Sequence, residues 1–222
     1  KNLYKVLAVN HEVNLESCDY TFITESELYS CSVESYDYVI VTGGDGLLRR
    51  VVSWIHRTIP HSDTSPVVLL NPKGTSNIYR KFHNCASIQQ FQSYLKGTTS
   101  IKVKACPYYS LNDEIFLFSA GNSFDLACIK LSEKLRPFLS GFSRYFCSGM
   151  IITPLLFYYL TKQLLNSNIF FIFKLPFRQL KGRTIPQNGA VDFQLDGDIV
   201  HIPNSEQLKI EEKGTFLLMT EF

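Results

Sequence analysis

The sequence predicts an α/β protein with two domains: an N-terminal domain on a parallel sheet and a C-terminal domain that is a mostly antiparallel β-sandwich. Up to residue 98, buried apolar runs alternate with helical patterns, which is typical of a parallel sheet covered by helices. After residue 99, short segments alternate polar and apolar side chains, which indicates antiparallel strands with one solvent-exposed face. We therefore expect domains at 1–98 and 99–222, and leave open whether the last strand packs back on the first domain.

Three apolar runs rich in β-branched residues predict the strands of the first domain, and three stretches with helical spacing predict its helices. Leu47, Leu48 and Val51, for example, fall on one side of a helix, with Arg49 and Arg50 elsewhere. The polar stretch 10–35 predicts no clear element. In chain order, we expect strands at 3–9, 36–42 and 66–71 and helices at 47–58, 78–82 and 86–96.

The second domain combines short strands with one long helical region. Residues 101–104 and part of 114–119 alternate with period two, and 131–165 has a mostly helical pattern. The remaining strands are separated by Asp-Gly, Pro-Asn and Lys-Gly pairs, which favour turns. These strands are expected at 191–195, 199–202, 208–210 and 215–220.

Charge and hydropathy exclude two classes of partner. The net charge of +2 is too small to imply a nucleic acid. The most apolar stretches, 151–165 and 169–177, are shorter than the roughly 20 residues of a spanning helix. They are also interrupted by Pro154, Lys162 and Lys174. We therefore expect no transmembrane segment.

The cysteines and basic residues favour a reduced, cytoplasmic setting without defining a partner. No two of the six cysteines have the spacing of a zinc or redox motif, so we expect free thiols. Basic residues are frequent between residues 102 and 183, interleaved with apolar ones. They indicate either a solvated surface or a face that meets anionic lipid or phosphate. The sequence leaves a homodimer open.

The loop Gly43-Gly44-Asp45-Gly46 lies between a predicted strand and a predicted helix. Glycine lets backbone N–H groups approach a phosphate and permits positive φ angles, and a helix N-terminus adds a favourable dipole. An aspartate in such a loop can organise Mg²⁺ or accept a proton from a hydroxyl. The pattern predicts a phosphate site, with a ligand-free turn as the alternative.

A second loop, 72–77, follows the next predicted strand, so both loops should lie at the carboxyl edge of one sheet. Thr75 and Asn77 offer hydroxyl and amide groups to a phosphate, ribose or base. Alternatively, Asn77 is the N-cap of the following helix.

With these two loops in place, the sequence resembles the diacylglycerol kinase-type lipid kinases, which include sphingosine, ceramide and bacterial lipid kinases. The segments that carry the resemblance are YDYVIVTGGDGLLRRVV, LNPKGTSNIYRKF, FSAGNSFDLACIKLSEKLRPFLSGFSRY and FQLDGDIV. The resemblance implies the two-domain fold of diacylglycerol kinases and NAD kinases. Within it, Gly43, Gly44, Gly46, Gly74, Thr75 and Asn77 would hold ATP.

The same resemblance implies the catalytic groups. Asp45 would act as general base or magnesium organiser, and Asp125 would face the acceptor hydroxyl or lipid head. Alternatively, Asp125 caps a helix.

The resemblance also implies groups for the phosphates. Arg136 and Arg144 would neutralise phosphate, unless they are surface cations. Asp196 and Asp198 would lie near the nucleotide, through Mg²⁺, although Asp196-Gly197 is also an ordinary hairpin turn.

The implied function is transfer of the γ-phosphate of ATP to a lipid hydroxyl at a membrane surface, with Mg²⁺ and peripheral membrane association. Two departures from the family pattern are the pair Arg49-Arg50, where many members have Asn-Glu, and Ile78, where aspartate is usual. They favour the alternative of a degenerate, non-catalytic lipid- or nucleotide-binding relative. An NAD kinase-like or sugar kinase is a further alternative, because those families share the GGDG loop.

Overall fold

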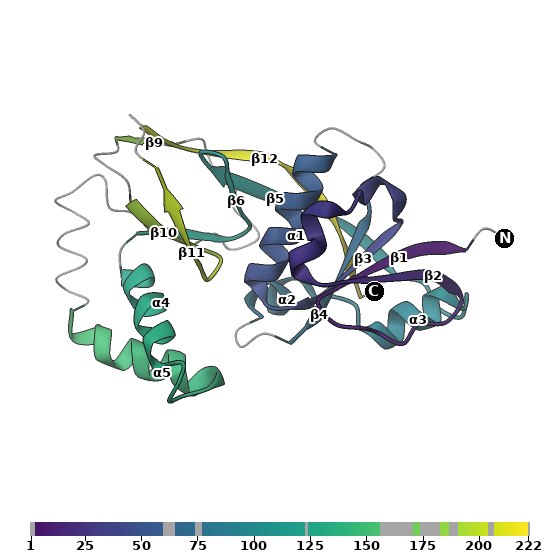
Figure 1. Ribbon diagram of the computed structural model, residues 1–222, viewed down its shortest axis with the longest axis horizontal. Coiled ribbons are helices and arrows are strands. Elements are labelled where there is room, and N and C mark those ends of the chain that lie inside the picture. Colours follow the sequence, from purple (N-terminus) through teal and green to yellow (C-terminus); the bar gives the residue numbers. More distant parts are fainter. Residues whose placement is uncertain are drawn as a thin grey trace. The chain divides into compact units, whose positions relative to one another are not determined.

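The computed structural model describes residues 3–59, 65–73, 77–122, 124–155, 171–173, 183–186, 191–203 and 207–221. The chain divides into two compact units (Figure 1). Unit 1 comprises Lys1–Tyr108 and Gly214–Phe222, and unit 2 comprises Tyr109–Lys213. The long strands β5 (Lys102–Leu111) and β12 (Gln207–Thr220) each contribute residues to both units. Unit 2 is therefore an insertion into the sequence of unit 1.

Unit 1 is built on parallel strands. In chain order these are β1 (Tyr4–Val9), β2 (Cys18–Ile23), β3 (Tyr38–Gly43) and β4 (Val67–Pro72). They pair in the order β2-β1-β3-β4, and β12 then pairs with β4, also in parallel. The runs Val6–Val9 of β1 and Tyr38–Thr42 of β3 are buried without interruption, as expected for a sheet covered on both faces.

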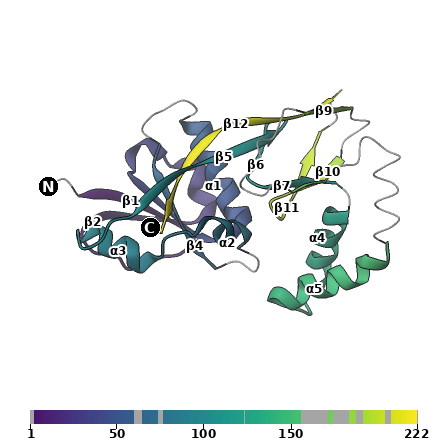
Figure 2. The same cartoon turned by 180° about the vertical axis from the view of Figure 1, so that it is seen from behind.

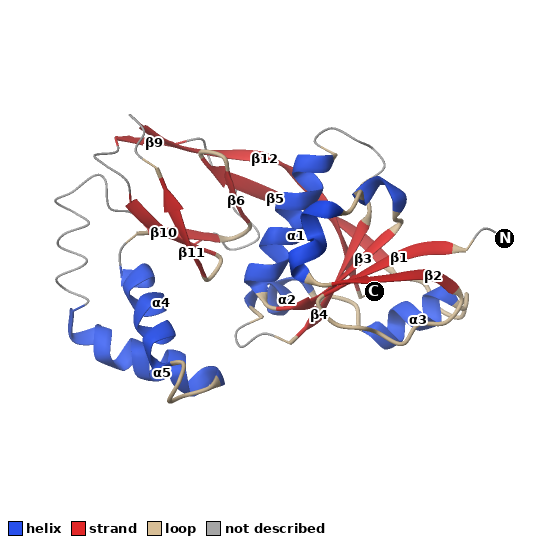
Figure 3. Ribbon diagram, in the orientation of Figure 1, coloured by secondary structure: helices blue, strands red, loops and turns tan. Residues whose placement is uncertain are grey.

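Two helices cover this sheet (Figures 1 and 3). Phe91 of α3 (Ile88–Leu95) packs in one cluster with Val6, Ala8 and Ile40. Successive residues of a strand point to opposite faces of the sheet. Helix α1 (Asp45–Thr58) also packs against β3. Trp54 of α1 is 1% exposed. The predicted strands and helices of this domain are thus present, with ends shifted by a few residues.

The stretch 10–35, for which the sequence predicted no element, contains the edge strand β2. It also contains the 3-10 helices η1 (Glu25–Ser30) and η2 (Val33–Ser35). Among the described strands, β2 pairs with β1 alone. It is half exposed, so it lacks the continuous apolar run that marks a buried strand. Pairing with β1, rather than local pattern, makes it a strand.

Unit 2 contains a separate four-stranded sheet, ordered β11-β10-β7-β8 and antiparallel throughout (Figure 2). Its strands are β7 (Ser119–Gly121), β8 (Phe171–Phe173), β10 (Val191–Leu195) and β11 (Asp198–Ile202). Strand β6 (Glu114–Phe116) pairs with β5, and β9 (Arg183–Pro186) pairs with β12. The core of the unit packs Phe116, Phe193 and Leu208 together.

The helical part of unit 2 consists of α4 (Phe124–Leu135) and α5 (Gly141–Ile152), followed by η3 (Thr153–Leu155). Helix α4 packs against β10 and β11, and α5 packs against α4. The predicted continuation of the helical region over 156–165 lies outside the described residues. No helix among the described residues is long and apolar enough to cross a membrane.

The expected turn at Lys213-Gly214 is wrong, because β12 runs unbroken through it. A Cβ atom on Gly214 would lie 2.8 Å from the Tyr108 hydroxyl. The glycine that suggested a turn therefore allows a close approach of Tyr108 to the β12 backbone.

Candidate functional site

The carboxyl edge of the parallel sheet in unit 1 carries a group of polar side chains. The chain passes from β1 to β2 on one side and then to β3 on the other, so the strand order reverses between β1 and β3. Open α/β sheets bind ligands at such a point. Here Asn10 Nδ2 donates to the Thr42 carbonyl oxygen at 3.2 Å, and Asn71 Nδ2 donates to Thr42 Oγ1 at 3.1 Å.

The glycine loop follows β3 at this edge. Gly43 ends the strand, Gly44 is the N-cap of α1, and Gly46 lies in the first turn of the helix. The expectation of positive φ angles here is wrong: among the described glycines, these angles occur at Gly97, Gly141 and Gly197. Gly43 instead lies close to Leu47: a Cβ atom there would lie 2.7 Å from Leu47 Cδ2, so the Leu47 side chain would have to shift.

Asp45 connects this loop to the next one. Its Oδ2 accepts from the backbone N–H of Ile78 at 2.8 Å, and its Oδ1 accepts from Tyr79 N–H at 3.0 Å. Burial raises the pKa of the Asp45 carboxyl, although both backbone bonds and Lys81 act in the opposite direction. The carboxylate thus caps the short helix α2 (Ile78–His83) from a distant part of the sequence.

Asn77 occupies the N-cap position of α2 in a left-handed conformation, and its side chain makes no capping hydrogen bond. Asp45 takes over that function. Ile78, one of the departures from the family pattern, contributes its backbone N–H to Asp45, which does not depend on the side chain. The substitution is therefore compatible with this loop geometry.

The second loop begins beside the first, because Lys73 N–H donates to the Gly43 carbonyl at 3.1 Å. Gly74 and Thr75 lie outside the described residues, so their nucleotide-binding roles stay predictions.

Arg49 and Arg50 have structural places in α1. Arg49 is buried, and Arg50 forms an ion pair with Glu25 of η1. The pair Arg49-Arg50 is therefore accommodated by the fold of unit 1.

Unit 2 holds a second polar network, centred on the buried side chain of Gln194 in β10. Gln194 Nε2 donates to Asp125 Oδ2 at 3.0 Å. Its Oε1 accepts from Gly197 N–H at 2.8 Å and from Ser119 Oγ at 3.2 Å. These two donors fix the orientation of the amide, so that its N–H groups face Asp125 in the first turn of α4.

Asp196 belongs to the same network and holds a backbone turn. Its carboxylate accepts from the N–H groups of Leu117 at 2.6 Å, Phe118 at 3.0 Å and Ser119 at 2.9 Å. Its backbone is left-handed, with φ of 50°, in the turn before Asp198 of β11. The structure thus joins Asp125 and Asp196 through Gln194 and Ser119.

Gln194 and Gly121 were missed by the sequence analysis. A Cβ atom on Gly121 would lie 2.4 Å from Asp125 Oδ2, so the carboxylate rests directly on the glycine. Each residue could be found only by its distance from a motif: Gln194 lies two residues before Asp196, and Gly121 lies four residues before Asp125.

The other predicted residues of unit 2 do not join this network in the described contacts. Arg136 is exposed just after α4 and pairs with Glu133 at 3.2 Å. Arg144 lies half-buried in α5, where its carbonyl accepts from Ser148 Oγ. No cluster of three or more His, Cys, Asp or Glu side chains that could hold a metal occurs among the described residues. The metal roles of Asp196 and Asp198 stay predictions.

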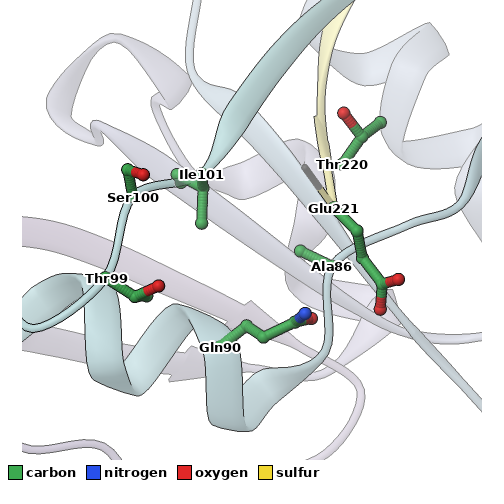
Figure 4. A pocket seen from close by; sticks show the side chains of 7 residues that line it. All are labelled: Ala86, Gln90, Thr99, Ser100, Ile101, Thr220 and Glu221. Carbon is green, nitrogen blue, oxygen red and sulfur yellow. The ribbon is translucent and has the colours of Figure 1, made fainter.

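A cavity of about 280 Å³ lies elsewhere in unit 1 (Figure 4). It is lined by Gln90 of α3, by residues 99–101 before β5, by Ala86 and by the end of β12. None of the predicted site residues lines it, so it does not locate the nucleotide.

Comparison with known proteins bears on the family and the fold. The diacylglycerol kinase catalytic domain family matches residues 3–105. A proposed diacylglycerol kinase from Bacillus anthracis str. Sterne superposes with a TM-score of 0.58 at 14% identity, covering 100% of this chain and 98% of that one. Another structure of a diacylglycerol kinase from the same organism gives 0.54 at 14% identity, covering 98% and 94%. No curated protein matches the sequence. At this identity the two structures show the fold, and they confirm the predicted fold class.

Proposed function

Residues 3–105 belong to the diacylglycerol kinase catalytic domain family, and from this premise we propose that the chain is a lipid kinase that transfers the γ-phosphate of ATP to a lipid hydroxyl. The observation that carries the proposal is the Asp45 carboxylate, which connects the glycine loop to the second loop at the carboxyl edge of the sheet. Phosphoryl transfer depends mainly on positioning and charge neutralisation, to which Asp45 would contribute by holding the start of α2 beside the glycine loop.

The proposed roles divide between the two units. Backbone N–H groups of the glycine loop, at the start of α1, would bind the nucleotide phosphates together with Gly74, Thr75 and Asn77. Asp45 has both oxygens engaged by backbone donors, which suits a residue that positions the loops.

Asp125 would accept the proton of the attacking hydroxyl, oriented by Gln194. Arg136 and Arg144 would neutralise phosphate charge.

Magnesium would accompany ATP on its phosphates, where it neutralises the developing charge. Asp196 already accepts three backbone N–H bonds, which occupy most of the roughly four lone-pair sites of a carboxylate. This geometry does not favour Asp196 as a metal ligand. The metal role of Asp198 stays a prediction.

The proposed setting is the cytoplasmic surface of a membrane, where the protein would associate peripherally with its lipid substrate. A homodimer stays a prediction.

The test is phosphate transfer from labelled ATP, with Mg²⁺, to diacylglycerol, a sphingoid base, ceramide and phosphatidylglycerol. We expect one of these lipids to be phosphorylated and Asp125→Asn to reduce the rate by about 100-fold or more, as for loss of a general base. Nucleotide binding without transfer to any lipid would support the non-catalytic alternative. Phosphorylation of NAD or a sugar in their place would support the other kinase classes.

A further inference from the structure

Strand β2 lies at the edge of the parallel sheet of unit 1 (Figures 1 and 2). In the part of the chain that the structure describes, it pairs with β1 alone. The pairing begins with Tyr4 and Cys18 and continues residue for residue to Val9 and Ile23, so β2 contains no bulge. It contains no proline either. Edge strands are usually protected by a bulge, a proline, a covering segment or a charge, and of these β2 has one charged residue, Asp19.

The hydrogen bonds of β2 show which of its backbone groups face β1. The Ile23 carbonyl accepts from the N–H of Asn10, the residue after β1, at 2.9 Å. Ile23 therefore faces β1. The backbone groups of successive residues in a strand point alternately to its two sides. Asp19 and Thr21 consequently face β1 as well.

The backbone groups of Cys18, Tyr20 and Phe22 then face away from β1. Within the described chain, no hydrogen bond involves these outward N–H and C=O groups. The next outward residue is Thr24, whose N–H donates to the Glu27 side chain at 2.8 Å and so closes this end of the edge. Three backbone donors and three acceptors are thus open to a further strand.

The two faces of β2 determine which side chains such a strand would carry. Cys18, Tyr20 and Phe22 are partly buried and pack against the cluster that contains Phe91. Asp19 points to the opposite face and is exposed. In an added strand, alternate side chains would lie next to the apolar residues, and the intervening ones would lie next to Asp19.

The sequence around β2 is acidic. Between Lys5 and Arg49 it contains no Lys or Arg. Besides the buried Asp45, this stretch contains acidic residues that are exposed or half-exposed: Glu12, Glu16, Asp19, Glu25, Glu27, Glu34 and Asp37.

Part of this negative charge has no cationic partner. Glu16 and Glu25 each form an ion pair with a basic side chain. Glu12, in the loop before β2, and Asp19 form none with any described residue, although the register places Lys5 beside Asp19. A second copy of this edge would be repelled by its own charge, whereas basic side chains would be attracted.

We propose that the outer edge of β2 binds an extended segment of another protein as an added strand, and that this segment alternates apolar and basic side chains. Its backbone would pair with Cys18, Tyr20 and Phe22, which supplies affinity, and its basic side chains would lie near Asp19 and Glu12, which supplies selectivity. The edge is an interaction surface in addition to the proposed kinase site.

The test uses the full chain and a fluorescent synthetic peptide of about ten residues that alternates valine and lysine. Fluorescence anisotropy should show saturable binding. A peptide of the same sequence with N-methylated backbone amides keeps the charge but cannot donate to the edge, so it should bind at least about tenfold more weakly. In hydrogen exchange, which needs no variant, the segment 18–23 should gain protection when the unmethylated peptide is added.

Charge reversal tests the selectivity. Asp19→Lys should weaken binding of the valine–lysine peptide by about fivefold, because an attraction becomes a repulsion. The matched control is Asp113→Lys, which makes the same charge change at an exposed position in the turn between β5 and β6 of unit 2. It should bind the peptide like the wild type.

Absence of binding, equal binding of the plain and N-methylated peptides, or unchanged exchange in 18–23 would overturn the proposal. A concentration-dependent dimer that protects 18–23 without any peptide would show that a second copy occupies the edge, and would overturn the choice of partner. None of these measurements involves ATP or lipid, so their outcome is independent of the kinase assay.

Discussion

Two buried aspartates of the predicted motifs bind backbone N–H groups far away in the sequence. Asp45 holds the start of α2, and Asp196 holds the segment Leu117–Ser119. The sequence could indicate that these carboxylates matter, because each lies in a glycine turn. The sequence could not show which residues they contact, because a backbone N–H donor does not depend on the side chain of the residue that carries it.

The first prediction concerns Asp45. Asp45→Ala should lower the free energy of unfolding by about 1–2 kcal/mol, because two N–H groups of α2 lose their acceptor. It should also weaken ATP binding, since the carboxylate no longer links the glycine loop to the start of α2. Asp45→Asn keeps one acceptor oxygen and should lose less stability. Urea unfolding and ATP titration measure the two effects.

The pH dependence of this pair of variants provides the control. Burial raises the pKa of Asp45 above its ordinary value of 3.8, so the folded state resists its ionisation. The contribution of Asp45 to stability should therefore decrease as the pH rises above 3.8. The stability difference between wild type and Asp45→Asn should be larger near that pH than at neutral pH. A difference that does not vary with pH would contradict the assignment.

The second prediction concerns Gln194. Gln194→Ala should cost about 1–3 kcal/mol, because buried partners at Asp125, Ser119 and Gly197 lose their bonds. If Gln194 also orients Asp125, the turnover number should fall more than the Michaelis constant changes. Gln89→Ala, at an exposed position of α3, is the matched control. Unchanged turnover in a destabilised Gln194→Ala protein would leave Gln194 with a structural role alone.

The third prediction concerns His83, which stacks on Tyr79 with ring centroids 4.3 Å apart. Burial lowers its pKa from 6.5 to about 4. Since the unfolded chain takes up the proton first, the free energy of unfolding should decrease as the pH falls from 6.5 to about 4. His83→Phe keeps an aromatic ring against Tyr79 and should be less sensitive to acid over this range. His11→Gln, at an exposed position, should behave like the wild type in the same urea titrations.

At the scale of elements, the buried strands and amphipathic helices of unit 1 could be predicted from apolar periodicity. Strand β2 could not, because an edge strand with mixed polarity is determined by its neighbour. The continuous β12 was predicted as two strands because glycine after lysine resembles a turn signal. The close packing of Tyr108, which explains Gly214, is a tertiary contact that local sequence does not reveal.

The fourth prediction follows from that contact. Gly214→Ala should destabilise the protein by about 1–3 kcal/mol, because the added methyl group collides with the Tyr108 hydroxyl. Tyr108→Phe removes this hydroxyl, together with its 2.7 Å hydrogen bond to His56. The double variant should lose less unfolding free energy than the two single variants lose together, and a double-mutant cycle measures this difference. Full additivity would show that the two residues do not interact.

At the scale of the whole molecule, unit 1 is completed by residues that follow unit 2 in the sequence. Leu217 and Leu218 of β12 pair with Val67 and Val68 of β4. The change from a parallel to an antiparallel strand pattern could be predicted from the sequence. The return of the strand could only be left open, because the pattern 215–220 is equally consistent with either sheet.

The fifth prediction tests this return. A chain ending at Lys213 should lose the cooperative unfolding of unit 1, because β4 loses its neighbour and the buried Leu218 and Met219 are removed. Limited proteolysis should then cleave within 3–95 faster than in the full chain. Removal of Lys1 and Asn2 alone serves as the control and should leave the digestion pattern unchanged. Equal resistance of both truncated chains would contradict the pairing.

The position of Trp54 has a practical consequence for measuring these effects. It is the only tryptophan of the chain, and it lies buried in α1 with its indole N–H directed at the Cys31 carbonyl at 3.3 Å. Its fluorescence therefore reports on the folding of unit 1. A comparison of tryptophan emission with far-ultraviolet circular dichroism should show whether the two units melt together, without any label.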